Sequence, residues 1–116
     1  MTKPEFLQNA KQTFQECLAI LNKKSADYAT SQDPFKNFRM FESVPGFSVE
    51  QGIIYRIGDK LSRIATLLNG TPEVKDESVS DTLSDLINYT AILKIWLEQT
   101  QSKTNETKNP IEPSDL

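Results

Sequence analysis

Acidic side chains recur every four residues in one part of this chain, at Glu77, Asp81 and Asp85, and Asn88 and Tyr89 follow them. Residues four apart lie on the same side of an α-helix, so the three carboxylates would form a single ridge. Carboxylate oxygens bind hard cations such as Mg²⁺ or Mn²⁺, and through the cation they bind phosphates. We therefore predict a Mg²⁺ site on Glu77, Asp81 and Asp85, with Asp81 and Asp85 as the catalytic residues. The alternative is a solvated ridge whose first two acids stabilise a helix N-terminus.

Polar side chains are mixed with aromatic ones between residues 24 and 38. Aromatic faces can stack on a base while neighbouring polar groups hydrogen-bond to it. The same mixture suits a long loop that must satisfy its own backbone groups, and the sequence does not decide between the two. The ligand-binding candidates are Lys24, Asp27, Tyr28, Phe35, Asn37 and Phe38, with Asn88 and Tyr89 from the end of the acidic ridge.

Two basic residues, Lys60 and Arg63, complete the set of candidate ligand-binding residues. Both can contact phosphate oxygens directly, and arginine does so through two parallel hydrogen bonds. Each also has a simpler explanation. Arg63 could pair with Asp59 one turn earlier, and Lys60 could extend its aliphatic stem over the core.

The hydrophobic periodicity is helical, and no strand-like alternation of useful length is present. Cys17 lies within the apolar stripe of the first helix, so we expect it to be a buried small hydrophobic residue. Asp33 and Pro34 predict the N-cap and first position of a short helix. Asn69 and Gly70 form a helix stop, Pro72 marks a break, and Asp76 or Ser78 is a good N-cap for the helix that follows. The predicted helices cover residues 4–24, 34–41, 49–69 and 77–98.

These elements predict a single all-α domain over residues 1–99, followed by a disordered polar tail over residues 100–116. The last helix is apolar on two sides, because Ile92, Ile95 and Trp96 follow the acids along their side of the helix. Another helix or another subunit must cover that side. We therefore expect a small helical bundle that is completed by oligomerisation, with self-association through Ile92, Ile95 and Trp96.

Composition excludes several classes of function. The net charge of −3 argues against binding to duplex nucleic acid, which requires a basic face. Histidine is absent, so histidine-based catalysis and most zinc sites are excluded. No apolar run is long enough to span a membrane, and no secretion signal is visible. With its single cysteine, the chain is expected in the cytoplasm, which is the host cytoplasm if a phage encodes it.

Four ordered blocks of the sequence resemble the "nucleotide modification-associated" helical family of phages and bacteria. The blocks are Lys24–Tyr28, Asp33–Phe38, Gly58–Ile64 and Glu77–Tyr89. That family is distantly similar to the MazG-like all-α nucleoside triphosphate pyrophosphohydrolases. The resemblance implies a MazG-like helical bundle that oligomerises and hydrolyses a (d)NTP with Mg²⁺. In the MazG-like enzymes, acidic blocks on two successive helices hold the Mg²⁺.

The chain departs from the MazG-like pattern at those acidic blocks. Lys60 and Arg63 stand where the first block would have acids, and Thr82 replaces a Glu of the second block. Replacing acids by bases weakens a cation site, whereas the new bases can bind phosphate directly. The resemblance therefore favours a nucleotide ligand more than it favours hydrolysis.

Three functions follow from these observations. The first is Mg²⁺-dependent hydrolysis of a (d)NTP or related nucleotide by a homo-oligomer. The second is a non-catalytic sponge, in which a phage protein with an anti-defence role sequesters a nucleotide-derived signal such as a cyclic nucleotide. The third is a helical interaction module whose acidic ridge binds a basic partner.

Overall fold

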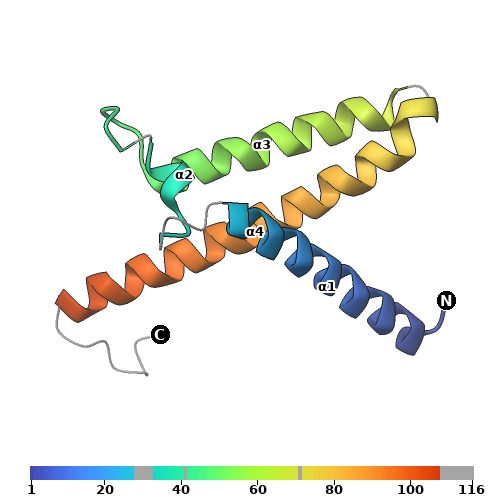
Figure 1. Ribbon diagram of the computed structural model, residues 1–116, viewed down its shortest axis with the longest axis horizontal. Coiled ribbons are helices and arrows are strands. Elements are labelled where there is room, and N and C mark those ends of the chain that lie inside the picture. Colours follow the sequence, from blue (N-terminus) through green and yellow to red (C-terminus); the bar gives the residue numbers. More distant parts are fainter. Residues whose placement is uncertain (28–32, 41, 71, 108–116) are drawn as a thin grey trace.

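The computed structural model describes the backbone of residues 1–27, 33–40, 42–70 and 72–107, and the side chains of residues 1–25, 33–40, 42–70 and 79–102. Over these ranges the regular structure is entirely helical (Figure 1). The helices are α1 (Lys3–Asp27), α2 (Lys36–Arg39), α3 (Val49–Leu68) and α4 (Pro72–Thr107). The predicted all-α class is therefore confirmed. No helix in the described part of the chain is long and apolar enough to cross a membrane.

The helix ends follow local sequence signals. A capping box begins α3, because the Ser48 side chain accepts a hydrogen bond from the Gln51 backbone at 3.2 Å and the Gln51 side chain accepts one from the Ser48 backbone at 2.9 Å. Each of these bonds satisfies a backbone donor that has no partner within the helix. The helix then ends at Leu68, directly before Asn69 and Gly70, as the sequence predicted.

Both ends of α4 differ from the prediction. The helix begins at Pro72, several residues before the predicted caps, because proline has a helical φ angle and suits a first helical position. It continues to Thr107, beyond the predicted end near residue 98. Residues 100–107 contain neither Gly nor Pro, and extending an existing helix costs far less than starting one. The rest of the predicted tail, residues 108–116, lies outside the described residues.

The helices α3 and α4 form an antiparallel hairpin, and α4 extends well beyond the start of α3 (Figure 1). The short helix α2 packs against this end of the hairpin, together with Phe35 directly before it. The first helix, α1, crosses α4 near the middle of α4, and its N-terminal half runs away from the hairpin (Figure 1). The buried core lies at the junction of α2, α3 and α4 and consists of Phe35, Phe38, Val49 and Ile53, with Ile57, Tyr89, Ile92, Leu93 and Trp96 partly buried around it.

The apolar side of α4 that follows the acids is covered in part within the chain itself. Ile92 and Trp96 pack against the core that α2 and α3 complete. Ile95 is 52% exposed. The sequence left open whether another helix or another subunit covers this side. In the structure, the core residues of the α2 segment and α3 cover Ile92 and Trp96.

Candidate functional site

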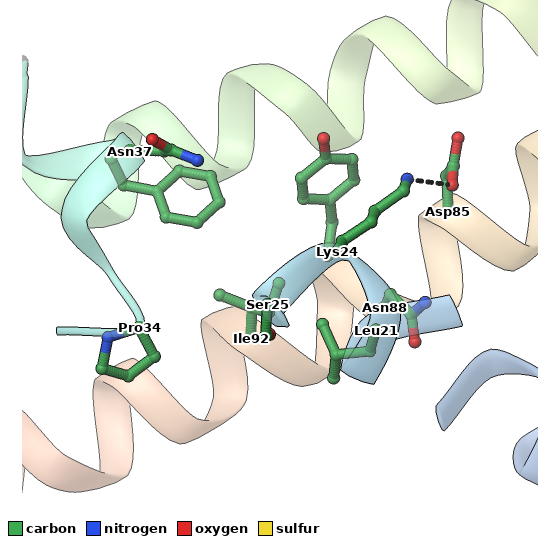
Figure 2. A pocket seen from close by; sticks show the side chains of 10 residues that line it. Leu21, Lys24, Ser25, Pro34, Asn37, Asp85, Asn88 and Ile92 are labelled. Carbon is green, nitrogen blue, oxygen red and sulfur yellow. Dashed lines mark hydrogen bonds and ion pairs between the residues drawn. The ribbon is translucent and has the colours of Figure 1, made fainter. Parts of the chain in front are cut away.

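A cavity of about 120 Å³ lies where the C-terminal end of α1, the α2 segment and the middle of α4 meet. Five of the predicted ligand-binding residues line it together with the predicted catalytic Asp85, although the sequence places them in three separate segments (Figure 2). The fold therefore collects most of the predicted site in one place. The lining residues are Leu21, Lys24, Ser25, Pro34, Asn37, Phe38, Asp85, Asn88, Tyr89 and Ile92.

Asp85 stands at one end of this cavity and bridges two lysines from different helices. Lys24 Nζ of α1 lies 3.1 Å from Asp85 Oδ1, a contact drawn in Figure 2. Lys60 Nζ of α3 lies 3.2 Å from Asp85 Oδ2. The Asp85 side chain is only 23% exposed, so these ion pairs are partly shielded from water. The cluster carries one negative and two positive charges and is therefore basic overall.

Two opposing effects set the pKa of Asp85. Partial burial raises this pKa, because a low-dielectric environment disfavours the charged carboxylate. The hydrogen bonds and charges of Lys24 and Lys60 together outweigh burial, and the pKa of Asp85 falls below its ordinary value. The Asp85 carboxylate is therefore ionised at neutral pH, and its oxygens already bind two ammonium groups.

Asn88 joins α1 to α4 beside this ion cluster. Its side-chain amide donates a hydrogen bond to the backbone carbonyl of Cys17 at 3.0 Å, and both side chains are buried. The prediction that Cys17 is a buried hydrophobic residue is confirmed. Asn88 thus holds α1 against α4 where the two helices cross. The Lys24–Asp85 ion pair is a second contact between the same two helices.

The aromatic candidates divide between the cavity and the core. The rings of Phe38 and Tyr89 both line the cavity and meet edge to face, with centroids 6.2 Å apart. Phe35 does not line the cavity, because its ring is buried against Trp96 at a centroid distance of 5.0 Å. Phe35 therefore has a core role. Phe38 contributes to the core and to the cavity.

A polar network that the sequence did not predict holds the α2 segment in place. Arg39 pairs with Asp33 and with Glu42, and its guanidinium lies 5.1 Å from the centre of the Trp96 ring. Trp96 Nε1 donates to Glu50 Oε2 at 2.7 Å. The Trp96 hydrogen bond lowers the pKa of Glu50, and the Asp33 hydrogen bond raises the pKa of Arg39. The signal that pointed to this network was Trp96 itself, because a buried indole N–H requires an acceptor.

Asp33 has a different local role from the predicted one. We expected it to cap a helix that begins at Pro34. Instead α2 begins at Lys36 without a side-chain cap, and Asp33 Oδ1 accepts a hydrogen bond from the Phe35 backbone at 3.0 Å. An aspartate that bonds the backbone two residues later forms an Asx turn, which competes with the helical start. This turn leads directly into Asn37 and Phe38 at the cavity.

The remaining predicted residues lie elsewhere. Arg63 is exposed on α3 and lines a second hollow of about 320 Å³ with Arg56, Asp59, Lys60 and Ser62. Lys60 therefore connects this hollow to Asp85 in the first cavity. Asp81 is exposed one turn before Asp85 on α4. The side chains of Asp27 and Glu77, and all of Tyr28, lie outside the described residues.

The predicted metal site involves residues that the structure describes only in part. Among the side chains that are described, no group of three or more acidic, histidine or cysteine residues is arranged to hold a metal ion. For Asp85 to bind a cation, its oxygens would have to exchange Lys24 and Lys60 for the metal. As arranged, these two ammonium groups repel a cation at that position.

Comparison of the chain with protein-family models, with curated proteins and with solved structures found no match.

Proposed function

We propose that this chain binds a nucleotide or nucleotide-derived small molecule in the cavity between α1, α2 and α4. One observation carries the proposal. Two lysines from different helices converge on Asp85 at the end of a cavity whose other walls include aromatic rings, amides and aliphatic side chains. Cationic groups beside aromatic and amide groups match the phosphate and the base of a nucleotide, respectively.

The charges favour an anionic ligand. Asp85 holds Lys24 and Lys60 about 3 Å from carboxylate oxygens, which is a hydrogen-bonding distance that phosphate oxygens also adopt. A terminal phosphate carries more negative charge than a carboxylate, so it competes effectively for both ammonium groups. Each charge-assisted hydrogen bond that forms contributes about 1.5–3 kcal/mol. On this proposal, Asp85 organises the two lysines before the ligand arrives.

The size of the cavity limits what enters it. Its volume of about 120 Å³ is close to the roughly 150 Å³ of an engineered cavity in another protein that binds benzene. We infer that a ring-sized part of the ligand lies against Phe38 and Tyr89, within reach of the Asn37 amide. Further phosphates extend past Lys60 toward Arg56 and Arg63, which line the adjoining hollow.

Mg²⁺-dependent hydrolysis by Asp85 and Asp81 is the second candidate. It is supported by the position of an ionised carboxylate, Asp85, between the two proposed phosphate-binding lysines. If a phosphate takes over these lysines, the Asp85 oxygens become available, and a bound Mg²⁺ would supply Lewis acidity there. The arrangement of the lysines around Asp85 favours direct binding without metal, so we rank binding first. The MazG-like form of the bundle and its homo-oligomeric state remain predictions.

The decisive experiment begins with mass spectrometry of small molecules that copurify with the full chain. Titration calorimetry with a panel of nucleoside mono-, di- and triphosphates and cyclic dinucleotides follows, each with Mg²⁺ and with EDTA. Direct binding predicts an affinity that EDTA leaves unchanged and no product by chromatography. Turnover that EDTA abolishes would instead establish hydrolysis.

Two lysine variants test whether the cavity is the site. Lys24→Met should weaken nucleotide binding by about 2–5 kcal/mol, because a phosphate charge loses its partner. Lys23→Met is the matched control, since Lys23 is exposed on the same helix, has the same charge and does not line the cavity. The control should bind like the parent chain. Equal losses in both variants, or no nucleotide binding by the parent chain at millimolar concentration, would refute the proposal.

A further inference from the structure

Two further hollows lie along α3, and shared residues link them to the first cavity. The second hollow, of about 320 Å³, begins at Lys60, whose ammonium group also bonds Asp85 in the first cavity. The third hollow, of about 300 Å³, shares Arg56 and Asp59 with the second. Its remaining lining residues are Phe47, Gly52 and Tyr55. Lys60 and Arg56 thus join the first cavity and the two hollows into one continuous series.

The second hollow is basic, although the chain as a whole carries a net charge of −3. Arg56, Lys60 and Arg63 line it together with one acid, Asp59. Among the described residues, neither the Arg56 nor the Arg63 side chain forms an ion pair or a hydrogen bond, so Arg63 does not pair with Asp59 as the sequence allowed. Two guanidinium groups are therefore available to phosphate oxygens, which arginine binds through two parallel hydrogen bonds.

The third hollow presents an exposed aromatic ring beside this basic surface. The rings of Phe47 and Tyr55 lie 6.3 Å apart between centroids, with 36° between their planes. Tyr55 is 69% exposed, and Arg56 is the next residue in the chain. Every nucleic acid base has a π-face that stacks on an accessible aromatic ring. An aromatic ring next to a guanidinium therefore suits a second nucleoside with a phosphate attached, as Phe38 and Tyr89 suit the first.

We propose, on the basis of the proposed nucleotide binding, that the ligand is a dinucleoside polyphosphate. One nucleoside lies in the first cavity, the other lies against Tyr55 in the third hollow, and the phosphates cross the second hollow. Lys60 and Arg56 lie about one turn apart on α3, a gap that a chain of several phosphates spans. Each bridging phosphate carries one negative charge, and several together compete with the single carboxylate of Asp85 for the lysines.

Basic side chains beside an exposed aromatic ring also occur in proteins that bind single-stranded nucleic acid. Two observations favour the smaller ligand. The basic surface extends only from Arg56 to Arg63, about two turns of α3, and has one aromatic site at each end. A longer strand would continue over a chain whose net charge is −3, which opposes a polyanion.

Titration calorimetry of the full chain in EDTA tests the second nucleoside site. It compares nucleoside tetraphosphates of adenosine, guanosine and uridine with the matching dinucleoside tetraphosphates. The two ligands of each pair have the same number of phosphates, and the nucleoside tetraphosphate has the higher charge. Any gain in affinity of the dinucleoside form therefore comes from its second nucleoside. We expect the dinucleoside form to bind about tenfold more tightly or better, the effect of one additional stacked base.

Variants on α3 test where the second nucleoside lies. Tyr55→Ala should abolish the gain of the dinucleoside form and leave the affinity for the nucleoside tetraphosphate unchanged, because only the second base loses its ring. Tyr55→Phe keeps the ring and should keep the gain. Arg56→Gln should weaken both forms, since both carry the phosphates. Leu61→Ala is the control at an exposed residue that lines none of these hollows and should change neither affinity.

These measurements separate the second nucleoside site from the proposed function. Failure of all these ligands to bind at millimolar concentration would refute nucleotide binding itself. If nucleoside tetraphosphates bind but dinucleoside forms bind no more tightly, nucleotide binding stands and the second site is refuted. Equal losses for both forms in Tyr55→Ala, or unchanged binding in Arg56→Gln, would also overturn the second site. So would a single-stranded oligonucleotide that binds more tightly than the dinucleoside tetraphosphates. Tyr55 is mostly exposed, so circular dichroism should show unchanged helix content in its variants.

Discussion

The α3–α4 hairpin and α1 differ in how much of their apolar surface the rest of the chain covers. The hairpin and the α2 segment bury Phe35, Phe38, Val49 and Ile53 together. Among the described side chains of α1, by contrast, Cys17 is the buried hydrophobic residue, while Phe14 and Leu18 lie mostly exposed. Stability is thus concentrated in the hairpin, and α1 is attached chiefly at its crossing with α4.

This difference bears directly on the candidate site. One wall of the cavity, made by α4 and α2, belongs to the packed core through Phe38, Tyr89 and Ile92. The other wall is the end of α1, which is tied to the core side by the Asn88 bond to Cys17 and by the Lys24 pair with Asp85. A ligand that bonds Lys24 would therefore act on the less firmly attached wall.

The largest expected effect tests whether stability resides in the hairpin. Ile53→Ala should destabilise the chain by about 2–5 kcal/mol, because Ile53 is fully buried and its loss leaves a cavity in the core. Urea unfolding measures this change. The neighbour Ile54 is mostly exposed, so Ile54→Ala is the control and should cost less than about 1 kcal/mol. Equal costs would show that the core at the junction of α2, α3 and α4 does not dominate stability.

A smaller effect is expected at the crossing of α1 and α4. Asn88→Leu keeps a similar volume but removes the donor to the Cys17 carbonyl, and it should cost about 1–3 kcal/mol. Hydrogen exchange should show faster opening of α1, while α3 keeps its protection. Faster exchange across α1 and α3 alike would mean that the two regions unfold as one unit.

The smallest effect concerns the acid sensitivity of the ion cluster. The pKa of Asp85 is lower in the folded chain than in the unfolded chain, so the unfolded chain takes up the proton first as the pH falls. The stabilisation is therefore fully present above the unfolded pKa, about 3.9, and is lost as the pH falls through the lower folded pKa. Asp85→Asn should remove this contribution, roughly 1 kcal/mol at neutral pH, and flatten the acid limb of a stability profile.

Chemical denaturation from neutral pH down to about pH 2 records that acid limb. Asp81→Asn is the matched control, because Asp81 is an exposed aspartate one turn earlier on the same helix. An acid limb in Asp85→Asn that matches the parent chain would show that the two lysines do not stabilise the folded state through Asp85.

Much of the helical content could be predicted, because helix formation depends on local patterns. The start of α3 at Val49 and its end before Asn69 and Gly70 follow from residues within a few positions of each boundary. The prediction was wrong at Pro72, where a residue interpreted as a break is the first of α4. Proline is compatible with both roles, and the sequence around it offered competing caps at Asp76 and Ser78.

The sequence by itself determined that the described chain is helical, which residues share each helical face, and that Lys24, Asp85 and Asn88 belong among the candidate site residues. The tertiary structure alone decided which faces meet. It placed two lysines on Asp85 from helices distant in sequence, turned Phe35 into the core and Phe38 toward the cavity, and left the first half of α1 bare. The physical reason is that helical periodicity fixes the direction of a side chain around its own axis, whereas its partner depends on how separate helices cross.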